Sequence, residues 1–290
     1  MSGTTPAPTM PGATTHAPTA PDPTAPAAAA PASAAPVRVT AEGRTGIIEL
    51  NRGEKYNCLS LEVFAHIGAA LDQFDKLPEL RAILVCATGK HFCTGADLDE
   101  FAAVRTNAET LRRFTATGHG VLRRLAQQPL PVIVAVQGLC LAGGLELMLA
   151  CDICFAASSA RFGDQHAQYG LVPGWGGSQR LPHAVGRRRA LDLLFSARWI
   201  GAEEALSWGL VNQVVSDQDL RAAALGYCQT NGTRSRDGMA VMKKLVDQGL
   251  DQTLEAGLAL ERELTSQALR TDDVSEGLAA FRERRAPDFG

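Results

Sequence analysis

The fold is decided by the stretch Val136-Gln-Gly-Leu-Cys-Leu-Ala-Gly-Gly-Leu-Glu-Leu-Met-Leu-Ala-Cys-Asp152. The β-branched apolar run 132–136, which leads into it, is typical of a buried strand. Glycines interrupt the stretch at Gly138 and at Gly143-Gly144, and helical character resumes at Leu145. A strand, a glycine break and a short apolar helix leave free backbone N–H groups at a helix N-terminus, where the macrodipole favours negative charge.

Glu146 lies three residues beyond Gly143, so its carboxyl group and the glycine amide share one face of the first helical turn. One helix start would then present an anion-stabilising amide beside a carboxylate, which suits the formation of an enolate next to an acid or base. The structural alternative is that the glycines only permit close helix–strand packing, and that Glu146 complements the helix dipole. The stretch by itself leaves both interpretations open.

Composition restricts the class of protein. The chain has 290 residues, of which 46% are hydrophobic and 20% charged, with a net charge of −3; this is enough apolar material for one large core or two small ones. The slightly acidic balance gives no reason to expect nucleic acid or a membrane surface as a partner, and no apolar run reaches membrane-spanning length. Seven cysteines at irregular spacings fit reduced thiols in a cytoplasmic protein. Cys151-x-x-Cys154 lacks a second Cys or His pair, so we interpret it as core packing and expect no metal.

Three segments differ in character. Residues 1–36 consist largely of Ala, Pro and Thr and carry nine of the 15 prolines, so we expect a disordered tail that has too little apolar surface to fold. In residues 37–217, predicted strands alternate with helices, which favours parallel pairing and an α/β core. Residues 218–290 show helical patterns only, which indicates a separate helical subdomain.

Apolar periodicity and turn residues predict the individual elements. Strands are expected at 44–51, 81–87, 132–136, from Asp152 to Ala156, and at 211–215. Helices are expected at 61–77, 109–127, 187–196, 202–208, 218–230, 238–248, 253–269 and 274–284. The segment from 157 to 177 is expected to be mostly loop.

Further motifs lie on both sides of the opening stretch. Before it are Asn51-Arg-Gly-Glu-Lys-Tyr-Asn-Cys-Leu59 and Lys90-His-Phe-Cys-Thr-Gly-Ala-Asp-Leu98, and after it are Gly170-Leu-Val-Pro-Gly-Trp-Gly-Gly-Ser-Gln-Arg-Leu181 and the segment 276–289. In this order and spacing, the motifs resemble those of the crotonase (enoyl-CoA hydratase/isomerase) superfamily over about residues 37–289. The resemblance implies a spiral of ββα repeats followed by an all-helical C-terminal trimerisation subdomain.

The resemblance also implies a coenzyme A thioester as substrate. The backbone N–H groups of Ala96 and Gly143 match the oxyanion hole of the family, which holds the thioester carbonyl. Two preorganised amides of this kind stabilise a developing enolate by a few kcal/mol per donor. The backbone of Ala96, Asp97, Leu98 and Asp99 is expected to meet the adenine end of coenzyme A. No cofactor is expected beyond the coenzyme A of the substrate, and the chain is expected to form a homotrimer or a dimer of trimers.

The chain departs from the family pattern at the second catalytic residue. Hydratases of the family carry two glutamates around one water, and the first of these matches Glu146. Where Pro-Glu is expected for the second, this chain has Gln165-His166. Imidazole titrates near neutrality and can act as acid or base, so a Glu146/His166 pair is competent for hydration. The alternative is that His166 only lines the pocket. Asp164 would orient the imidazole only if the loop between them bends.

Three functions therefore stay open. The first is reversible hydration of a 2-enoyl-CoA by Glu146 and His166 together. The second is a crotonase with a single carboxylate, acting as an isomerase, a decarboxylase, or a carbon–carbon lyase or hydrolase on acyl-CoA. The third is an acyl-CoA-binding protein without catalytic activity. Trp175 and Tyr169 either narrow the acyl pocket or pack against the core.

Overall fold

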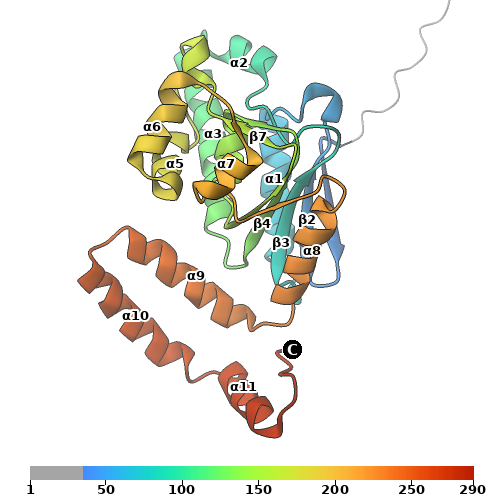
Figure 1. The fold of residues 1–290 in the computed structure, drawn as a ribbon, viewed down its shortest axis with the longest axis vertical. Coiled ribbons are helices and arrows are strands. Elements are labelled where there is room, and N and C mark those ends of the chain that lie inside the picture. Colours follow the sequence, from blue (N-terminus) through green and yellow to red (C-terminus); the bar gives the residue numbers. More distant parts are fainter. Residues whose placement is uncertain (1–34) are drawn as a thin grey trace, which may run out of the picture. The chain divides into compact units, whose positions relative to one another are not determined.

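The computed structural model describes residues 35–290, and its fold is shown in Figure 1. The tail expected at residues 1–36 lies outside the described residues, apart from its last two. The first element is β1, which begins at Val37, where the sequence predicted that the folded part starts.

A six-stranded sheet has the order β1-β2-β3-β4-β6-β9. Its strands are β1 (Val37–Glu42), β2 (Thr45–Leu50), β3 (Ala82–Ala87), β4 (Val132–Val136), β6 (Ile153–Ala157) and β9 (Gln213–Val215). β1 and β2 form an antiparallel hairpin, and every other neighbouring pair is parallel. The parallel pairing was predicted from the sequence, but β1 was not.

A second, smaller sheet contains β5 (Leu139–Leu141), β7 (Arg161–Gly163) and β8 (Ile200–Gly201). Isolated bridges pair Leu59 with Ala96 and Cys93 with Cys140, and they extend the same pattern to the earlier turns. Each turn of the chain thus places a strand in the large sheet, then a short strand or bridge, and then a helix. This is the predicted spiral of ββα repeats.

The helices fill the space between and around these sheets. They are α1 (Leu61–Phe74), α2 (Leu98–Val104), α3 (Ala108–Ala126), α4 (Gly143–Met148), α5 (Gly177–Val185), α6 (Arg187–Ser196), α7 (Ala202–Ser207), α8 (Leu220–Asn231), α9 (Arg236–Leu250), α10 (Leu254–Ala268) and α11 (Asp272–Glu283), with short 3-10 turns η1 (Gly53–Lys55) and η2 (His166–Tyr169). The segment 157–177, predicted to be mostly loop, contains β7 and η2 and ends at the start of α5. α2 was not predicted either.

Both faces of the central strands of the large sheet, β3 and β4, are buried. On β3, Ile83 and Val85 face the main core, which α1 and α3 cover, whereas Leu84 faces a second cluster under Leu220 and Ala224 of α8. Figure 1 shows α8 lying along the strands of the large sheet. Burial on both faces explains why the strands are continuous apolar runs rather than alternating ones.

The C-terminal segment is entirely helical, as predicted. α9 and α10 pack side by side (Figure 1), and α9 contacts the core through Lys243, whose Nζ donates to Asp152 Oδ2 at 2.7 Å. Large apolar side chains are exposed along these helices, namely Met242, Val246, Leu250, Leu254, Leu258, Leu269, Leu278 and Phe281. Across residues 35–290, we find no helix that combines the length and the apolar character needed to span a membrane.

Candidate active site

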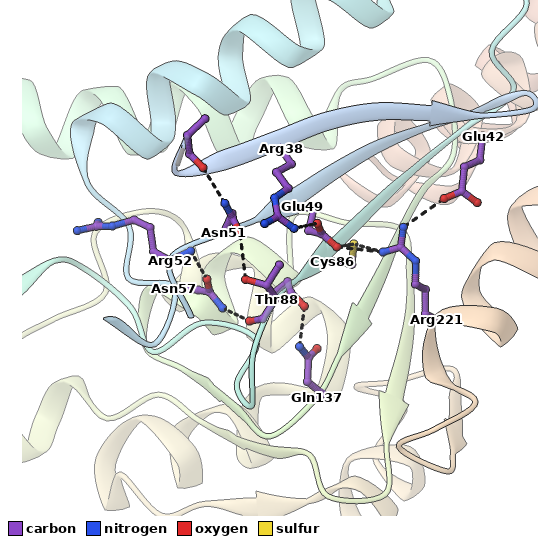
Figure 2. A network of polar contacts seen from close by, with 12 residues as sticks. Arg38, Glu42, Glu49, Asn51, Arg52, Asn57, Cys86, Thr88, Gln137 and Arg221 are labelled. Atoms are coloured by element: carbon purple, nitrogen blue, oxygen red, sulfur yellow. Dashed lines mark hydrogen bonds and ion pairs between the residues drawn. The ribbon is translucent and has the colours of Figure 1, made fainter. Parts of the chain in front are cut away.

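A polar network holds the loops that follow the large-sheet strands (Figure 2). The buried Asn57 side chain donates to the carbonyls of Thr88 at 2.8 Å and His91 at 2.9 Å, and it accepts from the Arg52 amide at 2.8 Å. Gln137 donates to the last carbonyl of β3 at 2.8 Å. These bonds tie the exits of β2, β3 and β4 together, and they fix the segment that leads to Ala96.

The Ala96 amide is left free by the bridge to Leu59. Leu59 donates to the carbonyl of Gly95 and accepts from the amide of Asp97, both at 2.8 Å, so the amide of Ala96 points away from Leu59. Gly95, with φ of 109°, packs against Gly143: a Cβ added to Gly95 would lie 3.2 Å from the Gly143 nitrogen. Within residues 35–290, the hydrogen bonds include no acceptor for the N–H of Ala96 or Gly143. The structure therefore brings these two loops together with both amides available to a ligand.

Gly143 opens α4 through a sharp turn. Ala142, the residue before it, has φ of 47° and ψ of −119°, and its amide donates to the carbonyl of Gly163 at 2.9 Å. Gly144 is pressed against the Cys93 carbonyl, which would lie 2.2 Å from any added Cβ. Only glycine fits this approach, so the Gly-Gly pair permits close packing at a buried helix start and also leaves the Gly143 amide free.

The carboxyl group of Glu146 is held by two backbone amides. The residue is only 1% exposed, and Oε1 accepts from the amides of Trp175 at 2.7 Å and Gly177 at 2.8 Å. Oε2 is buried and has no hydrogen-bond partner among the described residues. Burial raises the pKa of this carboxyl, although the two amides and the charge of His166 oppose the rise. Oε2 is therefore the oxygen available for proton transfer.

His166 lies in η2 and is oriented by Asp164. Nδ1 of the imidazole lies 3.0 Å from Asp164 Oδ1, and Gln165 between them adopts a left-handed conformation with φ of 63°. A proton on Nδ1 is donated to Asp164 Oδ1, which leaves Nε2 as the nitrogen that accepts a proton; the other oxygen of Asp164, Oδ2, is buried without a partner among the described residues. Burial lowers the pKa of His166, but the hydrogen bond to Asp164 and the charges of Asp164 and Glu146 outweigh it, so the pKa is raised. His166 and Glu146 thus lie within electrostatic reach of each other.

The predicted adenine-binding residues lie at the start of α2. The side chain of Asp97 is part of the scaffold, because it caps Glu100 at 3.4 Å and pairs with Arg52 at 3.0 Å. Burial by itself raises the pKa of Asp97, but the bonds to Arg52 and to the Glu100 amide outweigh it, and the pKa is lowered. Leu98 and Asp99 are exposed and open to a ligand.

The structure separates the two bulky residues of the next loop. The indole of Trp175 is 4% exposed and packs edge-on against Phe64, with ring centroids 4.9 Å apart. Tyr169 is 69% exposed, so its ring is not part of the core. The ring of Trp175 therefore packs in the core, and one edge of it also contacts Gly143, so core packing does not exclude a position beside the site. All seven cysteines are free thiols, and Cys154 is buried as expected. In the described part of the chain, no group of three His, Cys, Asp or Glu side chains is arranged to hold a metal ion.

Sequence reasoning missed the residues that hold Glu146. The amides of Trp175 and Gly177 flank Gly176, which has φ of 114°, and Arg180 Nη1 donates to the Trp175 carbonyl at 2.9 Å. Backbone amides leave no signature of their own in a sequence. The available signal was the Gly-rich run 174–177 directly before a helix, which is typical of a backbone anion site.

The chain belongs to the enoyl-CoA hydratase/isomerase family, whose model matches residues 41–290. It is 38% identical to a probable enoyl-CoA hydratase of Mycobacterium bovis over 87% of this chain and 97% of the relative. It is 37% identical to the human mitochondrial methylglutaconyl-CoA hydratase over 87% of this chain and 76% of that protein. The crystal structure of an enoyl-CoA hydratase from Bacillus anthracis superposes with a TM-score of 0.84 at 34% identity, over 88% of this chain and 98% of the other.

Proposed function

We propose that this chain catalyses the reversible hydration of a 2-enoyl-CoA, with Glu146 and His166 as the acid–base pair. The observation that carries the proposal is a buried carboxyl group, with one oxygen unpaired among the described residues, within electrostatic reach of an imidazole whose Nδ1 is held by Asp164. The family membership and the hydratase relatives support the same reaction.

The amides of Ala96 and Gly143 would hold the thioester oxygen. As water adds to C3, negative charge moves onto this oxygen, and the two N–H groups would stabilise it there. In enzymes where one such donor has been removed, the barrier rises by about 3–4 kcal/mol. The N-terminal end of α4 adds a favourable dipole at the same place.

Proton transfer would be divided between the two side chains. Neutral His166 accepts a proton at Nε2 from the water as the water oxygen bonds to C3. Protonated Glu146 delivers the proton on Oε2 to C2, and the product is a 3-hydroxyacyl-CoA. The directions of the pKa shifts suit these roles, because burial makes Glu146 keep its proton to higher pH, and the hydrogen bond and charge of Asp164 make His166 a stronger base.

The test is the reaction with crotonyl-CoA in ¹⁸O-labelled water, followed by mass spectrometry. Labelled 3-hydroxybutyryl-CoA is expected from the wild type. His166→Ala should slow hydration by ~10²–10⁴-fold, the usual contribution of a positioned acid or base, whereas His166→Glu should retain it. His119→Ala, which removes an exposed imidazole on α3, is the matched control. Hydration at near wild-type rate in His166→Ala would leave Glu146 as the sole acid–base residue and contradict the pair.

We further propose that the chain assembles as a homotrimer or a dimer of trimers. α9 and α10 contain no buried residue, although both carry large apolar side chains, so a partner surface would cover them. Sedimentation at micromolar concentration tests this, and a monomer would contradict it. The proposed reaction uses no cofactor beyond the coenzyme A of its substrate. A cytoplasmic location stays a prediction, which fractionation of cells would test.

A further inference from the structure

The indole of Trp175 forms a wall directly beside the proposed oxyanion amide. A Cβ added to Gly143 would lie 2.5 Å from Cζ3 and 2.9 Å from Cε3 of this ring. The hydrocarbon edge of the indole is therefore in contact with the residue whose amide would hold the thioester oxygen.

A second glycine makes room for the same ring. Gly118, on α3, faces the opposite edge, and a Cβ there would lie 2.5 Å from Nε1 of Trp175. Real Cβ atoms essentially never approach other atoms within 3.0 Å, so a side chain at position 118 or 143 would displace the indole. The polar edge of the ring thus faces α3, and its apolar edge faces the site.

The wall is fixed in position. Behind the ring, Phe64 and Phe114 are 0% and 2% exposed, and their ring centroids lie 4.9 and 5.5 Å from that of Trp175. The backbone amide of Trp175 also donates to Glu146 Oε1 at 2.7 Å. These aromatic contacts hold the ring in place, and moving its backbone would break the hydrogen bond from the Trp175 amide to Glu146.

We propose that Trp175 limits the length of the acyl group, so that the substrate class is the short-chain 2-enoyl-CoA thioesters. The inference rests on the proposed function, which places the carbonyl at Gly143 and C2–C3 beside Glu146. In that position the rest of the acyl group would extend past Gly143, the residue that the indole contacts. A short apolar group fits against the hydrocarbon edge of the ring, whereas a long chain meets the packed aromatic cluster.

The kinetic test compares crotonyl-CoA with trans-2-decenoyl-CoA in the wild type, Trp175→Phe and Trp175→Ala. The wild type should prefer crotonyl-CoA, and both variants should shift the ratio of the two kcat/KM values towards decenoyl-CoA by ~10-fold or more, since single methylenes change selectivity by that order. A ratio measured within one protein does not depend on how much of it is folded. Trp208→Phe, which removes an indole held between Arg189 and Arg198, is the control and should leave the ratio unchanged.

A binding test separates this inference from the reaction itself. Butyryl-CoA and decanoyl-CoA are saturated and cannot be hydrated, so calorimetry with both reports only on the pocket. Trp175→Ala should raise the affinity for decanoyl-CoA relative to butyryl-CoA by ~10-fold or more. An unchanged affinity ratio in Trp175→Phe and Trp175→Ala overturns the inference. If the ratio shifts while no enoyl thioester is hydrated, the pocket assignment stands and the proposed reaction falls.

Discussion

Nδ1 of His166 lies 3.0 Å from Oδ1 of Asp164, although one residue separates them in the sequence. That residue, Gln165, has φ of 63°, and its side chain donates to the carbonyl of Ala197. The bend turns two neighbouring side chains towards each other in a place where the carboxylate is 2% exposed and the imidazole 12%. A buried carboxylate thus sets both the tautomer and the basicity of the imidazole.

Asp164→Asn should move the pH dependence of the reaction. In the proposed role His166 acts as a base only when neutral, so its raised pKa should place the acid limb of kcat/KM above the ordinary imidazole value of about 6.5. Removing the charge of Asp164 lowers that pKa, so the limb should shift to lower pH, while the maximal rate falls because the tautomer is less well fixed. Rate profiles from pH 5 to 9 measure both effects. Asp75→Asn, at an exposed position, is the control, and an unmoved limb in Asp164→Asn would show that another group produces it.

Glu146→Gln should abolish turnover without loss of binding. The amide oxygen can still accept from Trp175 and Gly177, but the NH₂ group at the place of Oε2 cannot exchange a proton with substrate. We expect kcat to fall by ~10²–10⁴-fold and the dissociation constant for butyryl-CoA to change little. Glu62→Gln, on the exposed face of α1, should behave as wild type. A fall in kcat of less than ~10-fold, which is about 1.4 kcal/mol of barrier, would remove Glu146 from its proposed role.

Lys243→Met should destabilise the contact between α9 and the core. The Lys243 side chain is 12% exposed and forms an ion pair with Asp152. Burial raises the pKa of Asp152, and the charge and hydrogen bond of Lys243 partly oppose that rise. Removing one partner of a largely buried pair typically costs ~3 kcal/mol, because the other charge is left uncompensated. Chemical denaturation measures the loss, and Lys244→Met, at the next and exposed position, is the matched control. The double variant with Asp152→Asn should recover part of the loss; equal stability of Lys243→Met and Lys244→Met would show that the pair contributes nothing.

Ala142→Gly should stabilise the protein slightly. A φ of 47° with ψ of −119° is open to glycine but costs other residues ~1–3 kcal/mol. Glycine loses more backbone entropy on folding, by ~0.5–1 kcal/mol, so we expect a net gain of about 1 kcal/mol in the free energy of unfolding. Urea denaturation of the wild type and Ala142→Gly decides this, with Ala108→Gly at the start of α3 as a comparison that should lose stability. A less stable Ala142→Gly would mean that the methyl group contributes more by packing than its backbone costs.

Much of the fold could be predicted because the central elements are strongly patterned. β3 and β4 are uninterrupted apolar runs, which are typical of buried strands. At α1, the apolar periodicity and the capping residue Ser60, which accepts from the Val63 amide, indicate the same helix start. β1 was missed because its burial is uneven: Val37 is buried, and most of the strand is half-buried or exposed. α5 was missed because it starts after a glycine run and contains Pro182, both signals of a loop.

The site could be predicted only where side chains carry it. Glu146 and the glycines around it stand out in the sequence, but its two hydrogen-bond donors are backbone amides 29 and 31 residues further on. The contact between Asp164 and His166 depends on a positive φ at Gln165, a residue type that gives no hint of one. These features arise from tertiary packing, which imposes backbone conformations that local preference does not indicate.

The order of strands in the large sheet has a consequence for the order in which the chain folds during translation. From β1 to β9, each strand of the large sheet lies beside the one that precedes it in the sheet's chain order, so five of the six strands have been synthesised once β6 is complete. Ala96 and Gly143 belong to those earlier turns, but Asp164, His166 and the amides that hold Glu146 all follow β6. Nascent chains of increasing length should therefore acquire a protected sheet before they acquire a competent acid–base pair.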